Sequence, residues 1–195
     1  MSPARTLLLC VTLAAAAAAQ AATPSSATAA GVPAEWRTYD LLVDFRELPR
    51  TYSCDELWYR FRDVLLALGA RAYMTIVPYD CGYVGGGEAR SPRVEVKFQL
   101  PQPLHGAATR YAEVSAVKRS VRLAPGAPHS LQAGDCELVK QMQTLLLAAL
   151  PVQVTAADFS CTGPSTTFAL TLQAPFGVAA PARQAGVADA ATPRS

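Results

Sequence analysis

The sequence contains few histidines, and this scarcity limits the chemistry that it supports. Of 195 residues only two are histidine, His105 and His129, and both lie in connections that contain Pro and Gly. The chain also has no G-x-S-x-G motif to supply an activated serine and no C-x-x-C pair to begin a zinc site. These absences leave a serine hydrolase and a zinc site without support. We interpret both histidines as exposed loop residues.

Runs of positive charge are also missing. The chain has 17 Lys and Arg against 15 Asp and Glu, which gives a formal net charge of +2, and the basic residues do not cluster. A nucleic-acid-binding domain has a basic patch or stripe, so we predict no nucleic-acid partner. Beyond residue 21, no apolar run approaches the length that crosses a bilayer, and we expect no membrane span in the mature protein.

Residues 1–21 have the pattern of a secretory signal peptide. Arg5 precedes an apolar run, and Ala19-Gln20-Ala21 supplies a small-x-small cleavage site. Cleavage near Ala22 would also remove Cys10. We therefore predict a periplasmic or secreted protein of a bacterial envelope.

The two segments that flank the remaining chain are poor in large apolar residues. Residues 22–35 and 176–195 are rich in Ala, Pro, Ser and Gly and cannot bury enough surface to offset the entropy lost on ordering. We expect a disordered linker and a disordered tail around a single domain at residues 36–175, a common domain size.

Two similar phrases indicate that this domain is built twice. Residues 53–70 read SCDELWYRFRDVLLALGA, and residues 135–151 read DCELVKQMQTLLLAALP. In both, the apolar residues recur with helical spacing. The predicted stripe of the first helix contains Cys54, Trp58, Phe61, Leu65 and Leu68, and that of the second contains Leu138, Met142, Leu145 and Ala149.

The ends of both helices have recognisable signals. Ser53 and Glu56 have the spacing of a capping box at the start of the first helix, and Gly69 marks its end. Pro151 ends the second helix in the same way. The helices therefore occupy equivalent positions in two units.

The strands predicted around these helices complete the repeat. Strand-like alternation is found at residues 39–48, 72–80 and 92–100 around the first helix, and at 111–123, 152–160 and 166–173 around the second. This order defines two βαββ units, 36–103 and 109–175. One unit alone would leave an open strand edge, so we predict an α+β two-layer sandwich in which an antiparallel-rich sheet carries both helices on one face.

A pair of such units also resembles the modules of the vicinal-oxygen-chelate enzymes. That resemblance implies His and Glu metal ligands on the inward faces of the sheets. The strands predicted here contain no His, so the likeness is one of topology alone. We predict no metal and no cofactor.

The four cysteines that remain after signal cleavage allow three pairings. Cys54 and Cys81 are separated by 27 residues, and Cys136 and Cys161 by 25. A helix starting at Cys54 rises roughly 24 Å before it ends, and the following strand returns roughly 30 Å by Cys81. The same relation holds in the second unit. We therefore predict structural disulfides Cys54–Cys81 and Cys136–Cys161, each contributing about 3 kcal/mol of stability.

Features that occur in only one unit are free to serve a purpose other than folding. The first unit has a glycine-rich segment at residues 82–90 and many aromatic and arginine residues, which are favoured at recognition surfaces. We predict that Arg60, Tyr79 and Tyr83 contribute to a binding surface. The alternative is that Arg60 pairs with Glu56 one turn away on a solvated helix face.

The sequence therefore favours a non-enzymatic binding or envelope-accessory protein with an unknown protein or small-molecule partner. A second interpretation is a small periplasmic enzyme with its site in the cleft between the two units. His105, Glu88 and Glu113 are the acid–base groups that this enzyme would use. Their convergence in a pocket would favour the enzyme.

Overall fold

The computed structural model describes residues 31–81, 90–163 and 166–179. Helices and strands follow one another as β1 (Val32–Asp44), α1 (Cys54–Ala67), β2 (Thr75–Tyr79), β3 (Arg93–Pro103), β4 (Val114–Leu123), α2 (Cys136–Leu145), β5 (Gln153–Ser160) and β6 (Thr167–Ala179). Short 3-10 helices occupy Gly106–Tyr111, Ala133–Asp135 and Leu147–Ala149. The predicted α+β class is confirmed.

All six strands belong to one sheet with the order β2-β3-β1-β4-β6-β5, and every pairing is antiparallel. The order reads the same from both edges when β1 is matched with β4, β2 with β5 and β3 with β6. We call β1, α1, β2 and β3 the first half and β4, α2, β5 and β6 the second half. The halves share one arrangement, and a common origin of their sequences stays a prediction.

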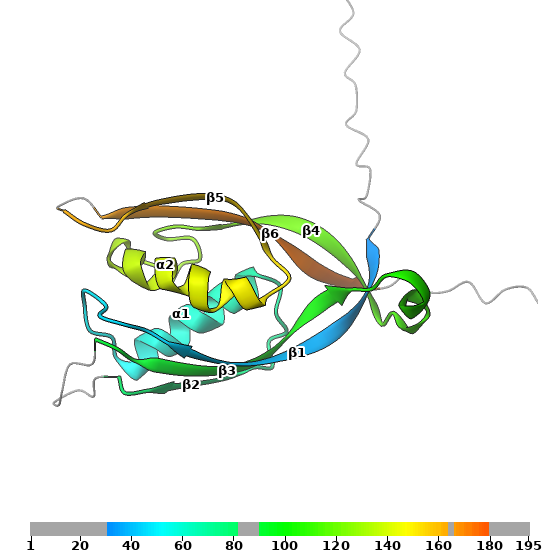
Figure 1. The fold of residues 1–195 in the computed structure, drawn as a ribbon, viewed down its shortest axis with the longest axis horizontal. Coiled ribbons are helices and arrows are strands. Elements are labelled where there is room, and N and C mark those ends of the chain that lie inside the picture. The colour runs from blue at the N-terminus through cyan, green and yellow to red at the C-terminus, as the bar shows by residue number, and fades with distance from the viewer. Residues whose placement is uncertain (1–30, 82–89, 164–165, 180–195) are drawn as a thin grey trace, which may run out of the picture.

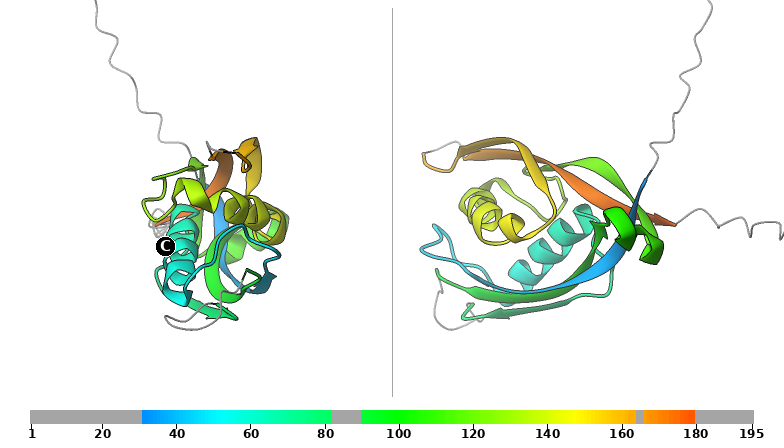
Figure 2. Two further views of the ribbon diagram at one scale, coloured as in Figure 1. Left: turned by 90° about the vertical axis from the view of Figure 1, so that its left-hand side faces the viewer. Right: turned by 45° about the vertical axis from the view of Figure 1, so that its right-hand side comes forward.

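The join between the halves is short. β1 pairs with β4 only through Val32–Ala34 and Val114–Ala116, whereas β1 pairs with β3 over eleven residues. Figure 1 shows the consequence: beyond the join, the strands of the two halves diverge as two arms, and α1 and α2 lie between them. The second view in Figure 2 shows the same placement of the helices. Both helices therefore cover the inner face of a strongly bent sheet.

Both ends of the described chain lie at this join. β1 starts at Val32, and Ala179 at the end of β6 is paired with Val114. Regular structure thus extends four residues into each of the flanking segments that we expected to be disordered, because these residues gain backbone partners on β4 and, for Glu35, on β3. The remainder of both segments, and the predicted signal peptide, lie outside the described residues.

α1 forms as its sequence predicts. The Ser53 hydroxyl accepts a hydrogen bond from the Glu56 backbone N–H, and the Glu56 carboxylate accepts one from the Ser53 N–H, which completes the capping box. Gly69 follows the helix at φ +90°, a left-handed conformation that favours glycine. A Cβ there would lie 3.0 Å from the Pro175 carbonyl oxygen of the second half. Gly69 thus both ends α1 and permits close packing.

α2 is shorter than predicted. Leu138 and Met142 are buried as expected, but Leu145 and Ala149 are exposed, and Leu146, Leu147 and Leu150 are buried instead. The α-helix ends at Leu145 and the chain continues as a short 3-10 helix. The buried stripe continues in steps of four residues through Met142, Leu146 and Leu150, so the predicted stripe was wrong by one position beyond Met142.

The two disulfides join the start of each helix to the end of a strand in the same half. Cys54 is bonded to Cys81 and Cys136 to Cys161, with a Cα–Cα distance of 5.3 Å in both. The predicted pairings are therefore present. Each bridge fixes its helix to the inner face of its own arm.

Candidate functional site

The recognition residues predicted from the sequence are not all at the surface. Tyr79 ends β2 with 41% of its surface exposed, and its hydroxyl donates to Glu95 at 2.9 Å. This hydrogen bond raises the pKa of the Tyr79 phenol. Tyr83 lies outside the described residues. Tyr79 therefore stands on the outer face of the first arm, the face opposite the helices.

Arg60, by contrast, is only 4% exposed and lies between the two halves. Its Nε donates to the Asp135 carboxylate at 2.8 Å, and a second guanidinium nitrogen donates to the Glu56 carbonyl oxygen at 3.1 Å. The expected ion pair with the Glu56 carboxylate is present at 3.6 Å, but Arg60 itself is buried while Glu56 is partly exposed. The Arg60 guanidinium is thus already engaged by Asp135, and a contribution of Arg60 to a binding surface stays a prediction.

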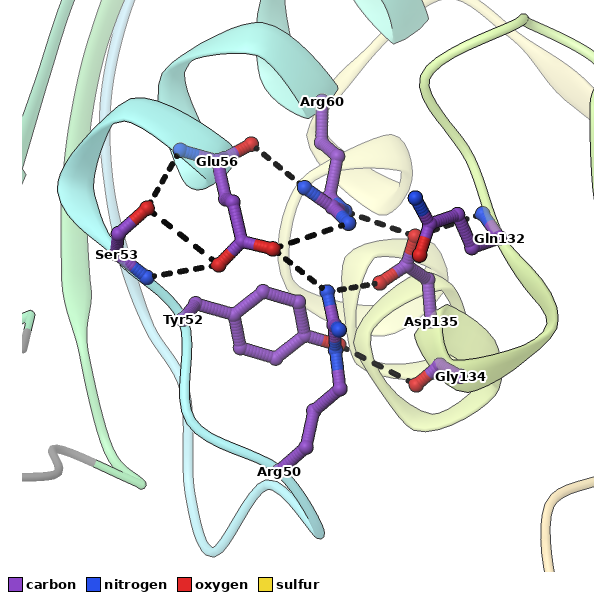
Figure 3. Close-up of polar contacts among 8 residues, drawn as sticks. All are labelled: Arg50, Tyr52, Ser53, Glu56, Arg60, Gln132, Gly134 and Asp135. Carbon is purple, nitrogen blue, oxygen red and sulfur yellow. Dashed lines mark hydrogen bonds and ion pairs between the residues drawn. The ribbon is translucent and has the colours of Figure 1, made fainter.

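Asp135 is fully buried and belongs to the second half. One carboxylate oxygen accepts from Arg60 and also from the Gln132 backbone N–H at 2.8 Å. The other oxygen lies 3.2 Å from an Arg50 guanidinium nitrogen. Two arginines of the first half therefore hold one carboxylate of the second, as Figure 3 shows. We call Arg50, Tyr52, Glu56, Arg60 and Asp135 the inter-half cluster.

Tyr52 lies at the centre of this cluster. Its ring centroid is 4.2 Å from the Arg50 guanidinium carbon, and its hydroxyl donates to the Gly134 carbonyl oxygen at 3.4 Å. Burial is the main cause of a raised pKa for Tyr52, and the nearby Asp135 carboxylate adds to it. Tyr52 consequently stays protonated near neutral pH, and it serves as packing and a hydrogen-bond donor instead of a general base.

Glu56 completes the cluster at its more exposed side, where 40% of the side chain is accessible. Burial opposes ionisation of its carboxylate, but the hydrogen bond from Ser53 and the charges of Arg50 and Arg60 outweigh it and lower the pKa of Glu56. Two guanidinium groups thus face two carboxylates. The cluster is close to neutral and contains no nucleophile, so its arrangement is suited to holding the halves together.

One feature of the sequence points to the inter-half cluster. Asp135 precedes Cys136 just as Ser53 precedes Cys54, and both are residue types that cap helices. Ser53 caps its own helix, but the Asp135 side chain makes no capping bond to α2. At the position that matches Ser53, a charged residue therefore indicates that Asp135 has a partner outside its own helix.

The outer face of the first arm carries a second candidate site. A hollow of about 490 Å³ is lined by Thr38, Ala72, Tyr73, Met74, Thr75, Lys97, Phe98 and Gln99. Tyr73 stands in its wall with 94% of its surface exposed. The Gln99 side-chain amide donates to the Thr38 hydroxyl at 3.3 Å, and Arg71 donates to the Gln99 side-chain oxygen at 3.1 Å. These bonds fix the polar groups of the hollow before any ligand arrives.

The structure describes two of the three residues that the enzyme interpretation requires, and these two lie on an exposed connection. His105 and Glu113 are both exposed on the connection between β3 and β4, and neither lines the hollow on the first arm. Glu88 lies outside the described residues. His129 is exposed in the loop before α2.

Two further findings concern metals and membranes. Within the described residues, no group of three or more His, Cys, Asp or Glu side chains is placed to hold a metal ion. Over the same part of the chain, no helix is long and apolar enough to cross a bilayer.

Comparisons with known proteins add no family to this description. No protein-family model, no curated protein and no solved structure matches the chain.

Proposed function

We propose that this chain is an exported, non-enzymatic binding protein and that its ligand engages the outer face of the first arm. The observation that carries this proposal is Tyr73, a tyrosine left 94% exposed in the wall of a hollow of about 490 Å³. Tyrosine presents a rigid apolar ring and a polar hydroxyl at little entropic cost, which is why it is enriched at binding surfaces.

Other outer-face residues support the same surface. Tyr79 is exposed at the end of β2 and is held in place by Glu95. Lys97 is paired with Asp40 at 3.4 Å across β3 and β1. One aromatic group just before the short edge strand β2 and one at its end, with fixed polar groups nearby, supply both contact area and directional hydrogen bonds.

The second half indicates that folding does not require this surface. β5, the strand matched with β2, carries Ala156 and Asp158 on its outer face, and its one aromatic residue, Phe159, lies on the other face opposite Phe168. The same strand order is thus achieved without exposed tyrosines. Retaining them on the first arm alone is consistent with a recognition role.

Export is the second part of the proposal. The disulfides are stable in oxidising compartments such as the periplasm or the cell exterior. The predicted signal peptide at residues 1–21 leads to the same compartments. We propose a periplasmic or secreted location.

The test uses the mature protein as bait for partners in envelope extracts, followed by titration calorimetry with the purified partner. The double substitution Tyr73→Ala and Tyr79→Ala should weaken binding at least tenfold, or by about 1.4 kcal/mol. Tyr59→Ala is the matched control, because Tyr59 is exposed on α1 and not on this face. Equal loss with the control variant, or full binding by the double variant, would place the recognition surface elsewhere.

A further inference from the structure

β5 is an edge strand with almost no protection. Seven of its eight residues are exposed, and only Phe159 is half-buried. It pairs with β6 on one side, and within the described residues no strand pairs with it on the other. The backbone N–H and C=O groups along that side therefore lack strand partners in the described chain. Such a row of groups is a template for a further strand.

The opposite edge of the sheet shows how this protein protects a strand. β2 has five residues and includes Pro78, which has no N–H to donate. Charged pairs also flank it, since Arg93 lies 2.9 Å from Asp80 beside the end of the strand. β5 has no proline and no basic residue, and its single charge is Asp158. The β2 edge of the sheet is thus protected against pairing with a further strand, and the β5 edge is not.

The part of β5 beyond its bulge has the regularity that pairing requires. The register with β6 shifts between Val154 and Ala156 and is continuous from Ala156 to Ser160. Ala156 and Asp158 point to the outer face, opposite Thr171 and Ala169, whereas Ala157 points to the helix-covered face with Leu170. Small side chains at Ala156 and Ala157 leave the backbone accessible.

We propose that β5 pairs antiparallel with β5 of a second copy of this chain, so that the sheet continues across a two-fold axis. With Ala157 opposite the same residue of the other copy, Asp158 faces Ala156 of that copy and the two carboxylates stay apart. A register shifted to place Asp158 opposite its own equivalent would bring like charges together, which is unfavourable. The proposed register therefore pairs the two strands without placing their carboxylates opposite each other.

A second copy fits this edge better than a foreign peptide does. Edge strands that select peptides use side-chain pockets along the edge for specificity. Residues 156–160 line none of three hollows found on the described part of the chain, one of which, of about 160 Å³, reaches Gln153 at the start of β5. The small net charge of +2 for the whole chain also opposes self-association only weakly.

The expected dimer is reversible. In this register only three residue pairs lie within the regular part of β5, since residues 159 and 160 fall opposite the bulge of the other copy. Three pairs bury less than the roughly 1,200 Å² of a standard stable interface, so association should depend on concentration. Sedimentation equilibrium of the full mature protein should show the mass rising from monomer toward dimer between about 1 µM and about 1 mM. Over the same range, hydrogen exchange at amides of residues 156–160 should slow.

Two substitutions in neighbouring positions should act in opposite directions. Ala157→Lys places two ammonium groups beside the axis and should weaken the dimer roughly tenfold. Ala156→Lys places an ammonium opposite Asp158 of the other copy, twice by symmetry, and should tighten the dimer at low salt. Val77→Lys on the other edge is the control and should leave association unchanged.

Three outcomes would overturn the proposal. The first is a monomer over the whole concentration range. The second is association that leaves exchange at residues 156–160 unaltered, which would place the interface elsewhere. The third is that the two lysine substitutions in β5 change the dissociation constant in the same direction, since the proposed register requires opposite signs.

Discussion

The two halves of this protein share an arrangement and differ in what they present. Each has a helix that begins at a half-cystine and a strand order that mirrors the other half. The residue before the helix differs: Ser53 caps α1, whereas Asp135 accepts a hydrogen bond from Arg60 of the opposite half. The shared features therefore build each half, whereas the unshared residues join the halves or remain free for recognition.

The largest expected effect comes from removing the carboxylate that joins the halves. Asp135→Ala leaves Arg60 buried without its main partner and should lower the free energy of unfolding by about 3–5 kcal/mol. Urea denaturation would measure this. Asp40→Ala removes the exposed ion pair with Lys97 and should cost less than about 1 kcal/mol. Equal losses in the two variants would contradict the role assigned to Asp135.

A double variant tests whether the ion pair or its packing is needed. Replacing Arg60 and Asp135 together by Leu removes both charges and should recover part of the stability lost in Asp135→Ala, because no buried charge is then left unpaired. A double variant less stable than the single one would show that the hydrogen bonds to Gln132 and Glu56 matter more than the pair itself.

The two disulfides should contribute equally to the free energy of unfolding. Replacing either Cys54 and Cys81 or Cys136 and Cys161 by Ala should cost about 3 kcal/mol, because the loops they close, 27 and 25 residues, are nearly the same length. Thermal unfolding of the two double variants gives the comparison. A much larger loss of stability in one double variant would show that the two bridges differ in native-state strain, or that one half keeps less of its structure once its bridge is removed.

The side-chain cap at the start of α1 has no equivalent at the start of α2, so removing it tests a feature of the first half alone. Ser53→Ala removes the hydroxyl that accepts from the Glu56 N–H and should cost about 1 kcal/mol. Ser120→Ala, at an exposed position on β4, is the control and should be nearly neutral. If Ser53→Ala proved neutral as well, Glu56 alone would be sufficient to cap α1.

The smallest effect concerns acid stability. The pKa of Glu56 is lower in the folded protein than its usual 4.5, so ionised Glu56 favours the folded state above that pH. This contribution is lost as the pH falls through the folded pKa. The stability difference between the wild type and Glu56→Gln should therefore be present at neutral pH, where it is small for a side chain 40% exposed, and should disappear under acid conditions. A difference independent of pH would mean that the charge of Glu56 does not matter.

Local patterns predicted much of this fold. Alternation and helical spacing placed the strands and helices, and the lengths of α1 and β2 brought Cys54 level with Cys81. The 3-10 turn after Leu145 was missed because a run of leucines has apolar residues in every register. The three-residue join of β1 and β4 depends on tertiary geometry that no local pattern contains.

The burial of Arg60 was only partly visible in the sequence. Arg60 is three residues after Leu57 and four before Val64, both buried, so helical periodicity already placed it toward the core. A buried guanidinium needs a buried partner, and Asp135 lies 75 residues away along the chain. Periodicity along one helix does not identify a partner on another.

The position of both chain ends at the join determines how the protein responds to a pulling force. Val32 and Ala179 both flank β4 at the same pole, so tension applied through the flanking segments peels β1 and β6 away from that pole, breaking the strand pairs one after another. Only a few hydrogen bonds between strands then resist the pulling force at any one moment. The covalent loops closed by Cys54 and Cys81 and by Cys136 and Cys161 do not lengthen, and they limit how far the chain extends once the join has opened.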